Sequence, residues 1–233
     1  MMSDDMMGDN MIVVENLYKK YTQGESESVV LSSITLTIAK GETVILKGVS
    51  GSGKTTLLSL IAGLDKPTSG TLLIEGEPIH KLPDAFASKL RASKIGMVFQ
   101  HFNLIEHLNV AENVMIPLIP HALPMREIHQ RVERALKLAN IDHKAKVEAG
   151  RLSGGEKQRT AIARALVSEP EIILCDEPTA NLDRENSLKF IAILKMLHQE
   201  GKTIVVATHD PLFEGLDFAH RVVPMVDGKI TDE

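Results

Sequence analysis

The feature that most constrains the fold is a glycine-rich segment between a predicted strand and a predicted helix. Residues 48–55 read Gly-Val-Ser-Gly-Ser-Gly-Lys-Thr, which fits the pattern G-x-x-x-x-G-K-[ST]. The apolar run 43–46 predicts a buried strand before it, and the pattern of 55–62 predicts a helix after it. Glycines let the backbone curl so that several N–H groups and the helix N-terminus point at one anion. The segment therefore predicts a phosphate-binding loop in an α/β fold.

Two side chains of this loop are expected to act directly on a nucleotide. Lys54 should reach the β- and γ-phosphates, and the Thr55 hydroxyl should bind Mg²⁺, which prefers hard oxygen ligands. A dinucleotide-binding fingerprint at 51–53 is the alternative, but the Lys-Thr pair that follows and the missing third glycine oppose it. The predicted nucleotide-binding residues of the loop are Gly48, Val49, Ser50, Gly51, Ser52, Gly53, Lys54, Thr55 and Thr56.

Two further predicted strands end in chemically active residues. The apolar run 172–175 is followed by Asp176 and Glu177, and the run 203–208 is followed by His209. Ligands bind at the carboxyl ends of parallel strands, so Asp176 is predicted to hold Mg²⁺ and Glu177 to polarise the attacking water as general base. His209 is expected to contact the γ-phosphate or to orient that water. Solvated acids and a structural histidine are the alternatives for these positions taken singly.

The order of elements predicts one α/β domain over 11–233, preceded by a loose extension at 1–10. Strands that alternate with helices imply a mainly parallel sheet, and the alternation near Met11 and at 34–38 predicts a β region at the N-terminus. Residues 71–79 are expected to form a hairpin that bends at 75–77. The sequence turns mainly helical from residue 84, with amphipathic spacing in 126–139, and indicates a helical insertion over roughly 83–168.

Composition narrows the class of protein. The net charge of −5 on 233 residues does not favour nucleic acid as a partner. The apolar runs are far shorter than the roughly 20 residues that span a bilayer, so the chain is not expected to cross one. Residues 1–10 lack the features of a secretory signal, and there is one cysteine, so a cytoplasmic location is expected. That cysteine, Cys175, is predicted to be a small buried hydrophobe.

A further motif lies between the phosphate loop and the acidic strand end. Residues 152–156 read Leu-Ser-Gly-Gly-Glu and precede a predicted helix at 157–167, where a serine and two glycines would form a second anion site. From about Met11 to its end the chain resembles the ABC ATPase family, a group of P-loop NTPases. Glu156 in place of the frequent glutamine, the form of 181–183 and the segment 64–70 resemble the branch of lipoprotein-release, macrolide-export and cell-division ATPases.

The resemblance implies a mechanism and its cofactors, ATP and Mg²⁺. Two copies would pair head to tail, with each ATP between Lys54 of one copy and the signature residues of the other. Gln100 would contact Mg²⁺ and sense the membrane partner, Tyr21 would stack on adenine with Tyr18 as the alternative, and Asp183 would belong to an interface loop. The signature residues are Ser153, Gly154, Gly155 and Glu156.

The resemblance also implies partners and a role in the cell. The chain would bind an integral membrane permease, lie at the cytoplasmic face of the inner (cell) membrane, and use ATP hydrolysis to power export or envelope extrusion. A module that transmits force to a membrane partner without transport is the alternative. A soluble ATPase of DNA maintenance or translation is opposed by the length and charge of the chain.

Overall fold

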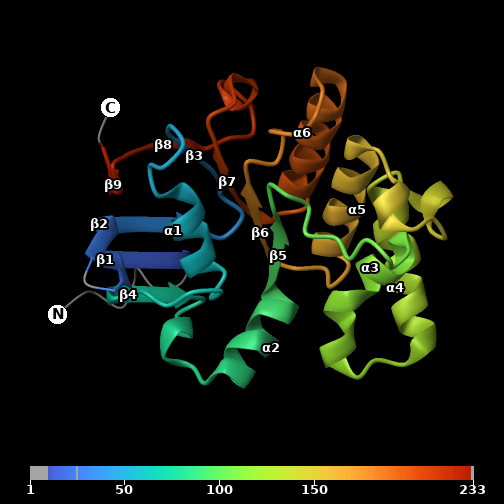
Figure 1. Cartoon of the computed structure of the whole chain (residues 1–233), viewed down its shortest axis with the longest axis horizontal. Helices are drawn as coiled ribbons and strands as arrows, with labels where there is room; N and C mark the ends of the chain where they lie inside the picture. The colour runs from blue at the N-terminus through green and yellow to red at the C-terminus, as the bar shows by residue number, and fades with distance from the viewer. Residues whose placement is uncertain (1–9, 25, 232–233) are drawn as a thin grey trace.

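Two sheets lie on either side of the first helix (Figure 1). The computed structural model describes residues 10–24 and 26–231. The smaller sheet is antiparallel and has the order β2-β1-β4, with β1 at Asn10–Gln23, β2 at Ser26–Ala39 and β4 at Ser69–Ile74. In β2 the alternate residues Ile34, Leu36 and Ile38 are buried, which follows from the period-two apolar pattern at 34–38 that predicted this region. Asn10 already belongs to β1, and the rest of the predicted extension lies outside the described residues.

The larger sheet carries the strands that end in functional residues. Its order is β5-β6-β7-β3-β8-β9, and all its pairs are parallel except β8 with β9. The mainly parallel P-loop core predicted from the sequence is therefore confirmed. The strand bounds are Thr43–Lys47 for β3, Ile95–Val98 for β5, Ile172–Asp176 for β6, Thr203–Thr208 for β7, Arg221–Val226 for β8 and Lys229–Ile230 for β9.

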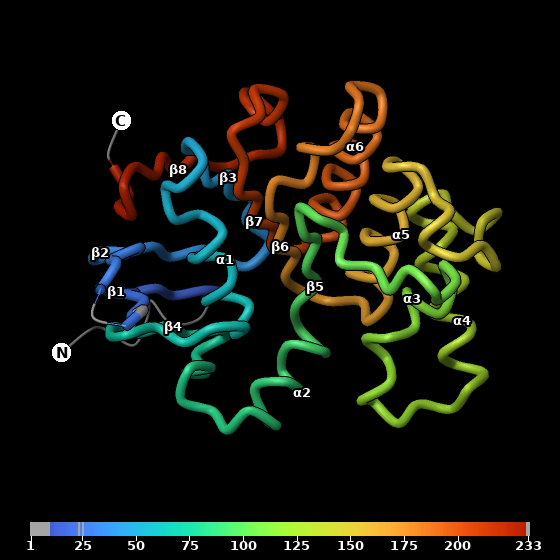
Figure 2. Tube along the Cα trace, viewed as in Figure 1, coloured from blue at the N-terminus to red at the C-terminus, as the bar shows by residue number. Residues whose placement is uncertain are grey.

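The described part of the chain contains six α-helices. Their bounds are Lys54–Ile61 for α1, Asp84–Lys94 for α2, Val110–Met115 for α3, Met125–Leu138 for α4, Gly154–Leu166 for α5 and Arg184–Gln199 for α6. Short 3₁₀ turns occur at Ile79–Lys81, Ile116–His121, Asp142–Lys144, Ala149–Arg151 and Pro211–Phe213. Figure 2 shows α3 and α4 together on the side of the molecule opposite β1 and β2. No helix within 10–24 and 26–231 has both the length and the apolarity to span a bilayer.

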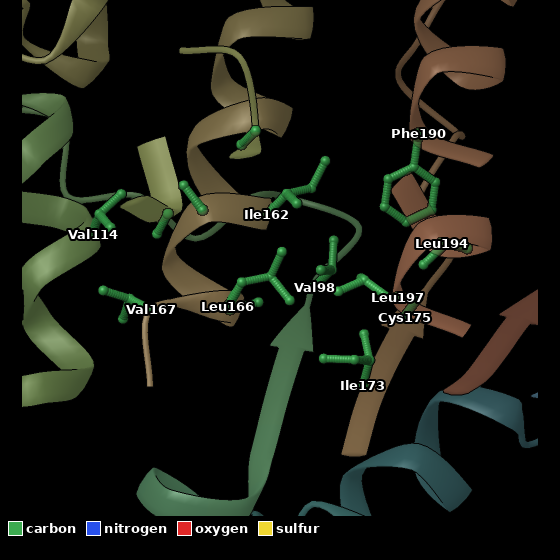
Figure 3. Packing of buried hydrophobic residues seen from close by; sticks show 14 of the residues in the cluster. Val98, Val114, Ile162, Leu166, Val167, Ile173, Cys175, Phe190, Leu194 and Leu197 are labelled. Carbon is green, nitrogen blue, oxygen red and sulfur yellow. The ribbon is translucent and has the colours of Figure 1, made fainter. Parts of the chain in front are cut away.

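The larger sheet has an apolar cluster on each face. Ile172 and Leu174 of β6 join the cluster that contains α1 and the smaller sheet, whereas Ile173 and Cys175 join the cluster built with α4, α5 and α6. Figure 3 shows this second cluster, in which Ile173 and Cys175 lie beneath side chains of α5 and α6. Residues of β6 therefore alternate between two cores, and the strand is buried throughout.

The structure corrects the predicted hairpin at 71–79. β4 pairs with β1, and after the turn at 75–77 only a single bridge joins Ile74 to Glu77 before a 3₁₀ turn begins at Ile79. Pro78 lacks a backbone N–H and cannot continue a ladder, which explains why no second strand forms.

The stretch 83–168 is also less helical than expected, because β5 lies within it and belongs to the larger sheet. A Cβ on Gly96 would lie 2.3 Å from the carbonyl oxygen of Ala165, so this glycine lets α5 pack directly on β5. The helical insertion that was predicted to begin near residue 83 is therefore interrupted by β5, which ends at Val98.

Candidate nucleotide-binding site

The loop between β3 and α1 is shaped by close backbone approaches. A Cβ on Gly48 would lie 2.3 Å from the carbonyl oxygen of Met225, so no larger residue fits there without a shift. Gly53 has a φ of 98°, and its Cβ would lie 2.7 Å from Leu31. Gly53 is also the N-cap of α1 and makes no side-chain cap bond, so the N-terminal N–H groups of α1 stay available to an anion.

Lys54 holds a buried positive charge over this loop. Its Nζ donates to the carbonyl oxygens of Gly48 at 2.6 Å and Val49 at 3.0 Å, and lies 3.6 Å from Glu177 Oε1. The residue is only 4% exposed, so these partners offset most of the cost of burying the ammonium group. The loop therefore presents a fixed cation and free N–H groups to the same space.

Thr55 and Asp176 bring two hard oxygens together where α1 begins and β6 ends. The Thr55 hydroxyl donates to Asp176 Oδ1 at 2.9 Å. Burial raises the pKa of Asp176, and the neighbouring charge of Glu177 raises it further, while the Thr55 bond opposes the shift. A divalent cation would reverse this tendency by favouring the carboxylate. The chemistry of this oxygen pair fits Mg²⁺, and Gln100 lines the same pocket as Thr55.

Glu177 is locked in one orientation at the end of β6. Its φ of 43° is left-handed, which is rare for a residue other than glycine, asparagine or aspartate. The carboxylate accepts from Thr208 Oγ1 at 3.2 Å and from the His209 backbone N–H at 3.4 Å, and His209 Nδ1 lies 3.0 Å from Oε1. A strained backbone with a fully bonded side chain indicates a position determined by its surroundings and typical of functional sites. The carboxylate faces the same pocket as the loop.

These elements enclose one pocket at the carboxyl edge of the sheet. The register of β6, β7 and β3 pairs Asp176 with Ala207 and Lys47 with Thr208, which aligns the three strand ends. The pocket is lined by Val30, Ser50, Gly51, Ser52, Gly53, Lys54, Thr55, Thr56, Gln100, Glu177 and His209.

The signature residues lie outside this pocket. Its lining includes none of Ser153, Gly154, Gly155 and Glu156. Ser153 is the N-cap of α5 and forms a capping box with Glu156: the Ser153 backbone N–H donates to Glu156 Oε2 at 2.8 Å. Lys144 Nζ lies 3.1 Å from Glu156 Oε1. The bond from the Ser153 backbone and the Lys144 contact lower the pKa of Glu156 to about 2. The signature residues therefore form the N-terminus of a second helix, apart from the pocket.

Two polar residues of α5 that sequence reasoning missed tie this helix to the pocket. Gln158 is 2% exposed, and its Nε2 donates to the carbonyl oxygen of Pro178 at 2.8 Å, just after Glu177. Arg164 donates to the carbonyl oxygens of Phe102 and Asn103, which both have left-handed backbones and follow Gln100. Burial lowers the pKa of Arg164. The sequence signal that could have indicated these contacts is the presence of polar residues within the apolar pattern of 157–167.

Asp183 is the N-cap of α6, with its side chain accepting from the Asn186 backbone N–H at 2.8 Å. Asn186 in turn accepts from Arg159 Nη1 at 3.0 Å, and its amide is the nearest group to a Cβ built on Gly155. The structure thus joins the loop that contains Asp183 to the helix that contains the signature residues.

Tyr21 lies on β1 and does not line the pocket, although Thr56 does. Burial and the bond to Asp65 raise the pKa of Tyr21, and the Thr56 hydroxyl lowers it, which places the ring beside the start of α1. Tyr21 is 45% exposed, whereas Tyr18 is half-buried in the same strand. Of the two tyrosines, Tyr21 is therefore the more accessible to a base.

Comparison with known proteins gives the family. The sequence profile of the ABC transporter family matches residues 31–180. An uncharacterised ABC transporter ATP-binding protein of Bacillus subtilis, YvrO, is 41% identical over 94% of this chain and 95% of its own length. The macrolide export ATP-binding/permease protein MacB of Mannheimia succiniciproducens is 41% identical over 96% of this chain, which spans 34% of MacB.

The solved structures agree. The dimeric ABC transporter cassette MJ0796, from Methanocaldococcus jannaschii, has a TM-score of 0.89 and 42% identity over 95% of this chain and 97% of its own. The same protein has been described in a post-hydrolysis dimer with ADP and phosphate, again with a TM-score of 0.89. The phosphate loop, the acidic strand end and the signature helix therefore identify the chain as an ATPase that belongs to the ABC transporter family, as one of its ATP-binding proteins.

Proposed function

We propose that the chain binds and hydrolyses ATP as a head-to-tail dimer that powers a separate membrane permease. The observation that carries this proposal is that the phosphate loop and the signature residues each form a helix N-terminus, at α1 and at α5, of which only the first lines the pocket. Because a helix N-terminus favours an anion, we infer that both bind the phosphates of ATP. Pairing two copies head to tail would place each Ser153 over the other copy's loop. The description of MJ0796 as a dimer supports this arrangement.

Each pocket residue has a chemical role in this proposal. The N–H groups of 48–53 and the ammonium of Lys54 bind the phosphates, and Thr55, Asp176 and Gln100 would hold Mg²⁺. Bound Mg²⁺ supplies positive charge that stabilises the transferring phosphoryl group. Glu177 takes a proton from the attacking water as the bond between the β–γ bridging oxygen and the γ-phosphorus breaks. His209 holds the Glu177 carboxylate in position through its Nδ1 contact.

The membrane role rests on similarity to relatives in which both parts share one polypeptide. MacB is named as an ATP-binding/permease protein, and this chain matches only about a third of it. On this similarity we infer that the chain works with a membrane permease at the cytoplasmic face of the cell membrane, and that transport runs outward. Membrane vesicles that hold the permease should transport substrate with this chain and not with Glu177→Gln. Equal transport with both would refute the coupling.

The dimer is tested by light scattering after size-exclusion chromatography of Glu177→Gln, with and without Mg-ATP. This variant is expected to bind ATP but to lose hydrolysis by about 10²-fold or more, which traps the dimer. A monomer that becomes a dimer only with nucleotide would support the proposal. Introducing Ser153→Ala into the Glu177→Gln variant should weaken that dimer, because alanine has no hydroxyl to contact the nucleotide bound by the other copy.

Glu133→Gln is the matched control, because Glu133 is an exposed acid of α4 paired with Lys137, away from the pocket. It should leave ATP turnover unchanged. A Glu177→Gln protein that stays monomeric at saturating Mg-ATP would overturn the homodimer, and near-normal turnover would overturn the role of Glu177.

A further inference from the structure

Three side chains from β1 and from the loop after α1 form a closed set of contacts, here called the Tyr21 cluster: Lys19, Tyr21 and Asp65. The Tyr21 hydroxyl donates to Asp65 Oδ2 at 2.7 Å. Lys19 Nζ donates to Asp65 Oδ1 at 2.8 Å and lies 4.6 Å from the centre of the Tyr21 ring. One carboxylate therefore restrains both the ring and the cation packed against it.

Burial makes this arrangement costly to rearrange. Lys19 is only 8% exposed, and besides Asp65 its Nζ donates to the carbonyl oxygen of Lys66 at 2.7 Å. Burial raises the pKa of Asp65, but hydrogen bonds from Lys19, Tyr21 and the Lys66 backbone outweigh it and hold that pKa below its usual range. Asp65 is thus ionised at neutral pH and fully engaged, and loss of its charge would leave Lys19 without its counter-ion.

The cluster leaves part of Tyr21 exposed near Thr56, a residue of α1 that lines the pocket. Lys19 occupies one side of the ring, as a cation over an aromatic face, while the residue is still 45% exposed. Thr56, which lines the pocket, is close enough for its hydroxyl to affect the phenol. A ring held by its hydroxyl and by a cation on one face presents the other face in a single orientation, which lowers the entropy lost when a base stacks on it.

We propose that Asp65 is a positioning residue for base binding: it fixes the Tyr21 ring, directly and through Lys19, with one face open to the purine of the bound nucleotide. This inference rests on the proposed function, ATP binding, and on the expectation from the sequence that Tyr21 stacks on the base. It adds a residue outside the pocket that sets the affinity for the base and leaves the binding of the phosphates unchanged.

The test measures the Kd of the full chain for two probes with Mg²⁺: a non-hydrolysable ATP analogue, and tripolyphosphate, which has no base. Tyr21→Ala should weaken binding of the ATP analogue about tenfold or more, the range for loss of one base–aromatic stack. Asp65→Asn and Tyr21→Phe should each weaken it roughly three- to tenfold. The affinity for tripolyphosphate should stay at the wild-type value in all three variants.

Two further measurements separate positioning from a general structural effect. In steady-state hydrolysis Asp65→Asn should raise KM for ATP with kcat unchanged, because the loop and Glu177 are intact. Combining Asp65→Asn with Tyr21→Ala should weaken binding no more than Tyr21→Ala alone. Asp84→Asn is the matched control, because Asp84 is an exposed acid that pairs with Lys66, the residue next to Asp65. This variant should bind both probes with wild-type affinity.

The outcomes distinguish the two levels of the proposal. If Tyr21→Ala weakens binding of the ATP analogue but Asp65→Asn does not, the positioning role is overturned and the stacking role of Tyr21 stands. If Asp65→Asn weakens tripolyphosphate binding as much as nucleotide binding, Asp65 acts through the loop and the inference is again wrong. If Tyr21→Ala binds the analogue normally, the assignment of Tyr21 to the base fails, and this inference fails with it.

Discussion

Glu156 caps the N-terminus of α5 and is one member of an ion pair. Its carboxylate accepts from the Ser153 backbone N–H and from the Ser153 hydroxyl, and it contacts Lys144. An acid in the first turn also suits the positive end of the α5 dipole. The glutamate that replaces the frequent glutamine therefore keeps the capping bonds and gains an ion pair.

These contacts predict a pH dependence. A carboxyl whose pKa is lowered to about 2 on folding contributes stability that is complete above its unfolded pKa, near 4.3, and is lost as the pH falls through about 2. The difference in free energy of unfolding between wild type and Glu156→Gln should therefore be largest above about pH 4.5 and shrink toward pH 2. Urea titrations between pH 7 and pH 2 measure it. Lys144→Met should keep most of the effect, because the Ser153 backbone bond is the larger cause. A difference that does not change with pH would contradict this prediction.

At the scale of single residues, the sequence predicted which residues share the pocket better than it predicted the residues that contact them. Lys54, Thr55 and Glu177 fall in one pocket because the motif and the strand ends are local patterns. The contacts of Glu177 with Thr208 and of Gln158 with Pro178 join segments far apart in the chain, so no local pattern predicts them.

The N-terminus of α6 offers a test of an element. Asp183 was predicted as an interface residue, and in the single chain its carboxylate caps this helix and bonds the Asn186 side chain. Asp183→Ala should lower the free energy of unfolding in the absence of nucleotide, because it removes the side chain that caps the helix.

Asp183→Asn is its matched control, because asparagine is an equally good N-cap. Urea denaturation of the monomer should show wild-type stability for Asn and a loss for Ala. Equal stability of all three proteins would mean that the cap contributes nothing and would leave only the predicted role at the interface.

Element boundaries followed the sequence where a strong local signal existed. β7 has the predicted bounds, and the bounds of α1 differ by one residue from the predicted helix at 55–62. The predictions that were wrong concerned which strands pair with each other. β4 found its partner in β1, and β5, four residues long, joined the sheet from within a helical stretch. Such choices depend on which segments meet in three dimensions, which period and propensity do not encode.

The whole molecule is organised around a sheet that divides two cores, which predicts how the chain unfolds. Ile173 and Leu174 are adjacent in β6, are 1% and 0% exposed, and point into different clusters. Truncating either to alanine should cost about 2–5 kcal/mol, because each leaves a cavity in a packed interior. Since the cores share the sheet, we expect one cooperative transition for both variants.

The two tyrosines make this measurable, because Tyr18 and Tyr21 both lie in β1 and report on one core only. Urea curves from tyrosine fluorescence and from far-ultraviolet circular dichroism should coincide for Ile173→Ala as well as for Leu174→Ala. Separate transitions in Ile173→Ala, with fluorescence lagging behind dichroism, would show that the two cores unfold independently.

The position of Cys175 has a practical consequence for watching the molecule work. It is the only thiol of the chain, it is wholly buried between β6 and the helices, and burial raises its pKa. Thiol reagents should therefore not react with the native protein. A single cysteine introduced elsewhere would then be the only site that is labelled. A cysteine placed at Val49, which is 71% exposed on the phosphate loop, would carry the only dye, and energy transfer between two labelled copies would follow their approach in real time.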